Sequence, residues 1–134
     1  MKNMNTTHFT SHKNTKEKGL LRFLVYFDPK DNEFVGICMD LSLIKTGRNP
    51  LEVERDVVEA AMGYVETVCK ENLPDKLLNQ KPPKEYIDVF NNYLALTSGS
   101  KEFKSLIKRK KEQELDLASM KTFLKPLVGL CHEI

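Results

Sequence analysis

The sequence predicts an α+β fold: an antiparallel β-β-β-α sheet covered by one long helix. Two apolar segments rich in β-forming residues, 20–27 and 33–39, are separated by turn residues 28–32 (Asp-Pro-Lys-Asp-Asn). A third extended segment covers residues 41–46. The long helix then begins after residues 47–50 (Gly-Arg-Asn-Pro), so three strands precede one helix.

The long helix has the strongest local signals in the chain. Asn49 can accept hydrogen bonds from the first turn, Pro50 suits the first helical position, and Glu52 completes a capping box. Apolar residues recur at three- and four-residue steps up to Val68, and Asn72 and Pro74 end the helix, which we expect over residues 50–71. The predicted core combines strand and helix residues: Phe23, Val25, Phe27, Val35, Ile37, Val57, Ala61, Tyr64, Val65 and Val68.

The rest of the chain divides into three parts. Residues 1–19 are polar and without periodicity, so we expect a disordered N-terminal arm, with order beginning at Gly19. Residues 20–97 form the α+β domain, and helical spacing within 86–94 favours a helix there over a strand across 86–90. Residues 98–134 are predicted to form a short, mainly helical C-terminal extension, with helical segments at 102–112 and 117–124. The sequence does not decide whether a fourth strand extends the sheet.

Composition restricts the function classes. The net charge of +2 over 134 residues is too small to predict nucleic-acid binding by the whole chain. Three cysteines, Cys38, Cys69 and Cys131, form no CxxC pair and cannot all pair within the chain, which favours a reducing compartment. No apolar segment approaches the roughly 20 residues of a membrane span. We therefore expect a cytoplasmic, soluble protein without membrane association.

The middle of the chain resembles the HicB-type antitoxin family. In that family a strand pair ends in an Asp-Leu step, a short third strand follows, and a Gly leads into a capped acidic helix. Here the matching residues are 34–37 (Phe-Val-Gly-Ile), Asp40-Leu41, Gly47 and 49–61. The resemblance covers roughly residues 22–70. Family members usually have a further strand after the helix, and many end in a DNA-binding module.

The resemblance implies a function as well as a fold. It implies a partial ribonuclease-H-like domain, not an enzyme, that binds a small basic RNA-cleaving HicA-type toxin and masks its active surface. The partner-binding residues would be Asp40 at the strand end and Glu52, Asp56 and Glu59 on the helix. Such domains also tend to self-associate. The exposed backbone of an outer strand invites pairing between two copies, so we expect a homodimer.

The acidic charge of the long helix fits a basic partner, but it also has another explanation. The long helix carries six carboxylates against two cations, a formal −4, which suits a basic partner. A merely solvated face, with intrahelical pairs such as Glu66–Lys70, explains the same pattern.

Residues 101–111 carry a formal +5. The alternative function is therefore a nucleic-acid-binding transcriptional regulator that uses this segment, although a solvated face or an intrachain partner for the acidic helix would also account for it. The residues that would contact DNA are Lys104, Lys108, Arg109, Lys110 and Lys111.

Catalytic and cofactor sites are not predicted. Asp28 and Asp40 fall at opposite ends of neighbouring antiparallel strands, which separates them too far for a two-metal nuclease centre. No Ser lies in a GxSxG setting and no Gly-rich loop follows a strand. We expect no metal and no cofactor.

Overall fold

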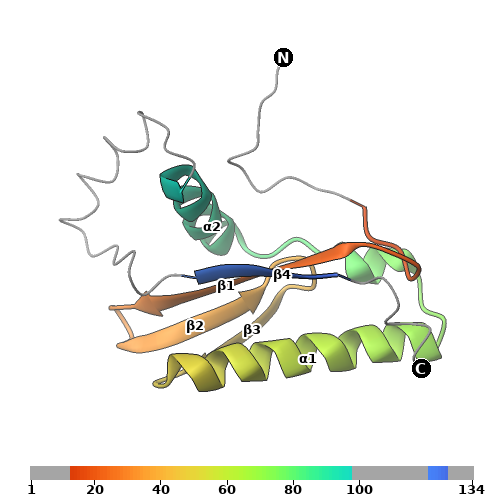
Figure 1. Ribbon diagram of the computed structural model, residues 1–134, viewed down its shortest axis with the longest axis horizontal. Coiled ribbons are helices and arrows are strands. Elements are labelled where there is room, and N and C mark those ends of the chain that lie inside the picture. The colour runs from red at the N-terminus through yellow and green to blue at the C-terminus, as the bar shows by residue number, and fades with distance from the viewer. Residues whose placement is uncertain (1–12, 98–120, 127–134) are drawn as a thin grey trace, which may run out of the picture.

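The computed structural model describes residues 13–97 and 121–126 (Figure 1). The first four elements follow the predicted β-β-β-α order, and a short 3-10 helix, a second α-helix and a fourth strand come after them. In chain order the elements are β1 (Leu20–Asp28), β2 (Glu33–Cys38), β3 (Leu43–Gly47), α1 (Pro50–Lys70), η1 (Asp75–Leu78), α2 (Lys84–Thr97) and β4 (Lys121–Pro126).

The four strands form one antiparallel sheet in the order β3-β2-β1-β4. Phe23 of β1 is the partner of Cys38 on one side and of Phe123 on the other. α1 lies on one face of this sheet and α2 on the other, so the described part of the molecule has three layers (Figure 1).

Because both faces of the sheet are covered, β1 and β2 are nearly continuous apolar runs rather than alternating ones. Leu21 and Phe23 pack in the cluster beneath α1, whereas Leu24 joins Ile37 in the cluster beneath α2. Most of the predicted core residues are buried. The exceptions are Phe27 and Tyr64, which are only partly buried.

α1 begins and ends where the sequence predicts, within one residue. The Asn49 side-chain oxygen accepts from the amides of Leu51 at 2.9 Å and Glu52 at 3.3 Å. At the other end Asn72 adopts φ 49°, and the amide of Leu73 donates to the Val68 carbonyl at 2.9 Å. This is the left-handed cap that the Asn residue favours.

Gly36 allows α1 to lie close to the sheet. A Cβ atom at this position would stand 2.7 Å from Val53 Cγ1 and 3.3 Å from the Val53 carbonyl oxygen. No side chain larger than hydrogen fits there without moving the helix, so Gly36 sets the distance between the two layers.

Two parts of the predicted fold differ from the structure. The sheet is covered by two helices, one on each face, rather than by one long helix; the helix predicted within residues 86–94 is confirmed as part of α2. The predicted helix over 117–124 is wrong for residues 121–124, which belong to β4 and pair with β1. A mainly helical C-terminal extension is therefore not observed in the part of it that the structure describes. Spacing within the segment could not reveal this pairing, because the partner strand lies a hundred residues earlier.

Order also begins before Gly19. Asn14 is completely buried. Its side-chain oxygen accepts from the Leu20 amide at 2.7 Å, and its side-chain amide donates to the Leu78 carbonyl at 2.9 Å. Asn79 completes the contact, because its side-chain oxygen accepts from the Asn14 backbone amide at 2.7 Å. These hydrogen bonds hold the N-terminal segment against η1, which a polar composition alone does not indicate.

Candidate partner-binding surface

Three of the four predicted partner-binding residues share one exposed helix face. Glu52, Asp56 and Glu59 are spaced four and three residues apart on α1, and all three are exposed. The buried stripe of α1 lies on the opposite side, against the sheet. We call Glu52, Asp56 and Glu59 the acidic face. Its side chains make few contacts with the chain: Asp56 Oδ1 is 3.8 Å from Arg55 Nε, a long and exposed ion pair.

Asp40, the fourth predicted residue, does not lie on this surface. It is 3% exposed. One of its carboxylate oxygens accepts from the Arg22 backbone amide at 2.7 Å, and the other lies 2.6 Å from Arg22 Nη2. The Asp40 carbonyl also accepts from the Gln80 amide at 2.7 Å.

Asp40 therefore joins the start of β1 to the end of β2 and to the chain after η1. This buried position differs from the expected role in partner binding. Continuing the β1–β2 register past Cys38 places Met39 opposite Arg22, and the Met39 amide donates to the Arg22 carbonyl at 2.8 Å, so Asp40 is the next residue along from the partner of Arg22. The expectation that Asp28 and Asp40 lie at opposite ends of the strand pair agrees with the same register, which pairs Asp28 with Glu33.

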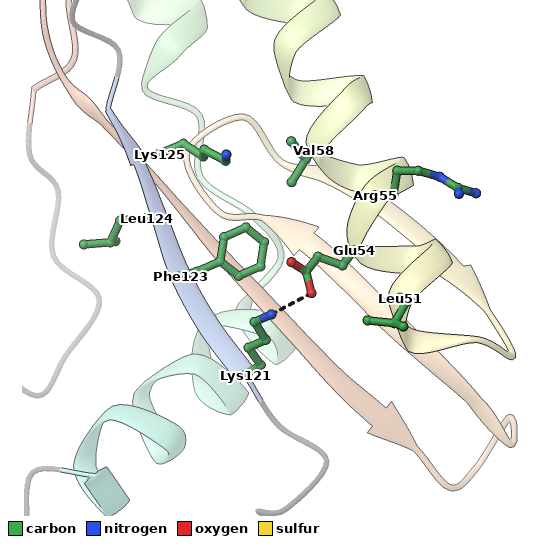
Figure 2. Close-up of a pocket in the computed structure, with 8 residues that line it drawn as sticks. All are labelled: Leu51, Glu54, Arg55, Val58, Lys121, Phe123, Leu124 and Lys125. Atoms are coloured by element: carbon green, nitrogen blue, oxygen red, sulfur yellow. Dashed lines mark hydrogen bonds and ion pairs between the residues drawn. The ribbon is translucent and has the colours of Figure 1, made fainter.

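The structure shows a groove that sequence reasoning missed. It lies between α1 and β4, has a volume of about 420 Å³, and is drawn in Figure 2. Glu54 of α1 and Lys121 of β4 bridge it with an ion pair of 2.8 Å. The lining residues are Leu51, Glu54, Arg55, Val58, Lys121, Phe123, Leu124 and Lys125. The groove could not be predicted once residues 117–124 were interpreted as a helix.

The cysteines differ in state. Cys38 is a buried free thiol, and burial raises its pKa to about 12, with the nearby Asp40 carboxylate adding to the rise. Such a thiol is neutral and unreactive at physiological pH. Cys69 is disulfide-bonded, which differs from the reduced cysteines that the sequence led us to expect.

The pKa values of two tyrosine hydroxyls, Tyr26 on β1 and Tyr86 on α2, are also raised. Burial is the largest cause of the raised pKa of Tyr26, and the neighbouring Tyr86 adds to it. Burial likewise raises the pKa of Tyr86, again with smaller contributions from nearby carboxylates such as Glu85. Both hydroxyls therefore stay protonated above the usual pKa of tyrosine, and both side chains pack against the apolar cluster beneath α2.

Other predicted sites fall outside the described residues or show no cluster. The basic residues Lys104, Lys108, Arg109, Lys110 and Lys111 all lie outside, so DNA contact through them stays a prediction. In the part of the chain that the structure describes, no three His, Cys, Asp or Glu side chains gather as ligands for a metal ion. Within residues 13–97 and 121–126, neither α-helix combines the length and the apolar character needed to cross a membrane.

Comparison with known proteins gives no relative. No protein-family model matches the chain, and neither a curated protein nor a solved structure matches it.

Proposed function

We propose that this chain is a non-enzymatic HicB-like binding protein, an antitoxin or an orphan relative of one, that masks a small basic RNA-cleaving toxin. The observation that carries the proposal is the acidic face: three exposed carboxylates on a capped helix laid across a β-β-β sheet. The residues that carry the family resemblance also support the proposal, since they lie at the ends of β2 and β3 and at the start of α1.

Asp40-Leu41 follows directly after β2, Gly47 ends β3, and Asn49 caps α1. The further strand that the family usually has corresponds best to β4, although here α2 comes between α1 and that strand.

The acidic face suits a basic partner on physical grounds. Within residues 13–97 and 121–126, its carboxylates form no short ion pair, unlike Glu54, which is held 2.8 Å from Lys121. Exposed charges of one sign attract an oppositely charged protein over about 8–10 Å at physiological ionic strength, and they raise the association rate more than the affinity. We accordingly expect the acidic face to guide a basic toxin onto α1.

The test begins with identification of the partner. The tagged full chain is purified from its own cells with its bound proteins, which are identified by mass spectrometry. We expect a small basic protein that cleaves RNA when separated from the chain and is inhibited when the chain is added back. Recovery of no RNA-cleaving protein, in an experiment where the tagged chain itself is recovered folded, would contradict the proposal.

Charge reversal then tests the acidic face itself. The triple variant Glu52→Lys, Asp56→Lys, Glu59→Lys should slow association with the toxin at least on the order of tenfold and lose inhibition at low protein concentration. The matched control reverses three exposed carboxylates elsewhere, Glu17, Asp31 and Glu85, and should inhibit like the wild type. Equal inhibition by both variants would remove α1 from the proposed interface.

A further inference from the structure

β4 forms one end of the sheet. In the strand order β3-β2-β1-β4 it pairs with β1, and among the described residues no strand pairs with its other edge. Backbone N–H and C=O groups along the outer edge of a strand are directed away from the sheet, where they can pair with another extended segment. The backbone of β4 is therefore arranged to accept a further strand.

Side chains on the α1 side of β4 alternate between basic and aromatic. The register pairs Lys121 with Val25, Phe123 with Phe23 and Lys125 with Leu21, and the β1 partners are buried beneath or beside α1. The Phe123 ring is fixed by stacking on Phe23, with ring centres 4.8 Å apart and planes 2° from parallel. Lys121 Nζ lies 5.5 Å from the centre of the Phe123 ring. One edge strand thus presents a lysine, a fixed aromatic ring and a second lysine at alternate positions.

The groove beside β4 has a net positive lining with apolar surface. Arg55, Lys121 and Lys125 contribute three cations, and Glu54, the one carboxylate in the lining, is bound to Lys121. Figure 2 shows Phe123 pointing toward α1 from β4, and Leu124 pointing to the other side of the strand. Leu51 is 74% exposed and Leu124 57%. A ligand that complements this surface must be acidic and carry apolar side chains.

A second copy of β4 complements this surface poorly. If two β4 strands paired antiparallel with Phe123 opposite its own counterpart, Lys121 of each copy would face Lys125 of the other. Like charges directly opposite one another on paired strands are destabilising. An acidic strand in the same place would instead bring a carboxylate to each lysine.

We propose that the outer edge of β4 and the adjoining groove bind an extended acidic segment of a partner protein by strand addition. One carboxylate pairs with Lys125, a second carboxylate four residues away shares Lys121 with Glu54, and the apolar side chain midway between them packs beside Phe123 at the groove. Backbone hydrogen bonds supply affinity, and the alternating side chains supply specificity. This surface is distinct from the acidic face and opposite in charge, so the inference does not depend on the proposed toxin partner.

The test uses a fluorescein-labelled synthetic peptide with the core Glu-Thr-Leu-Thr-Glu, titrated with the full chain while fluorescence anisotropy is recorded. We expect saturable binding that weakens as salt is added. Lys125→Glu should weaken binding on the order of tenfold, and a peptide with Lys in place of both Glu residues should bind this variant better than it binds the wild type. Replacing the Thr residues of the Glu peptide by Pro should abolish binding, because Pro donates no strand hydrogen bond.

The matched control is Lys45→Glu, which reverses an exposed lysine on β3 at the opposite edge of the sheet. Binding should be unchanged in this variant, once circular dichroism has shown that it is folded. No saturable binding by the wild type, or equal weakening by Lys45→Glu and Lys125→Glu, would overturn the proposal. A shift from dimer to monomer caused by Lys125→Glu, measured by sedimentation of the chain without peptide, would also overturn it by assigning the edge to a second copy.

Discussion

Asp40 and the acidic face use the same chemical group for different purposes. Asp40 is enclosed by the sheet and bound by Arg22, whereas Glu52, Asp56 and Glu59 project into solvent from the far side of α1. A carboxylate that is buried and paired stabilises the fold, and its partner is left with an uncompensated charge when it is removed. An exposed carboxylate contributes little to folding and can be used for recognition. Position relative to the core, rather than residue type, therefore separates the two roles.

The largest expected effect is at Asp40. Asp40→Ala removes the acceptor for the Arg22 backbone amide and the ion pair with the mostly buried Arg22 guanidinium. We expect the free energy of unfolding to fall by about 3–5 kcal/mol, measured by urea denaturation. The matched control, Asp56→Ala on the acidic face, should change it by less than about 0.5 kcal/mol. Similar losses in both variants would show that the distinction between the two positions is wrong.

Two glycines, Gly36 beneath α1 and Gly63 on its exposed side, should respond in opposite ways to substitution by alanine. Gly36→Ala places a methyl group 2.7 Å from Val53 Cγ1, and should destabilise the protein by about 2 kcal/mol because α1 must shift. Gly63 lies in α1 with nothing within 4 Å of its would-be Cβ, so Gly63→Ala should stabilise by about 0.5–1 kcal/mol. In urea denaturation, the midpoint of unfolding should therefore fall for Gly36→Ala and rise for Gly63→Ala. A stable Gly36→Ala protein would mean that the helix does not need this close approach.

Asn14 tests whether the N-terminal segment belongs to the folded unit. Asn14→Ala removes the hydrogen bond from the Leu20 amide and the one to the Leu78 carbonyl. We expect a loss of about 2 kcal/mol in the free energy of unfolding, with faster proteolysis near residue 14. Thr15→Ala, which removes an exposed hydrogen bond to Lys18, is the control and should cost less than about 0.5 kcal/mol. Equal stability of the two variants would show that the Asn14 hydrogen bonds do not stabilise the fold. Residues 13–19 would then not belong to the folded unit.

The smallest effect is expected on the acidic face. The combined variant Glu52→Gln, Asp56→Asn, Glu59→Gln keeps side-chain size and removes charge from exposed positions. Each change should alter the free energy of unfolding by less than about 0.5 kcal/mol in urea denaturation. A large loss of stability would show that these carboxylates support the fold, and would weaken their assignment to partner binding.

Much of the first half of the chain could be predicted because its signals are local. The turn after residue 27, the Asn49 cap and the apolar stripe of α1 each depend on residues within a few positions of one another. The family resemblance singled out Glu52, Asp56 and Glu59 on the helix. It grouped Asp40 with them because a family pattern records position along the chain and not burial.

The C-terminal part was harder because its structure depends on distant partners. Residues 121–126 become a strand through pairing with β1, and the groove exists only because that pairing brings Lys121 to Glu54. Likewise, nothing near Asn14 in the sequence indicates the carbonyl of Leu78 that it binds. Contacts of this kind depend on strand register and on how distant segments pack together. The spacing of apolar residues within one segment carries no information about either.

The amino-acid sequence by itself determined the order of the first strands, the boundaries of α1 and the charge of its outer face, since capping, turn chemistry and apolar spacing act over short distances. Only the tertiary structure decided that α2 covers the second face of the sheet, that β4 completes its edge, and that Asp40 is buried against Arg22. Those outcomes depend on which surfaces are left unburied after the local elements form, and on the long-range pairing that buries them.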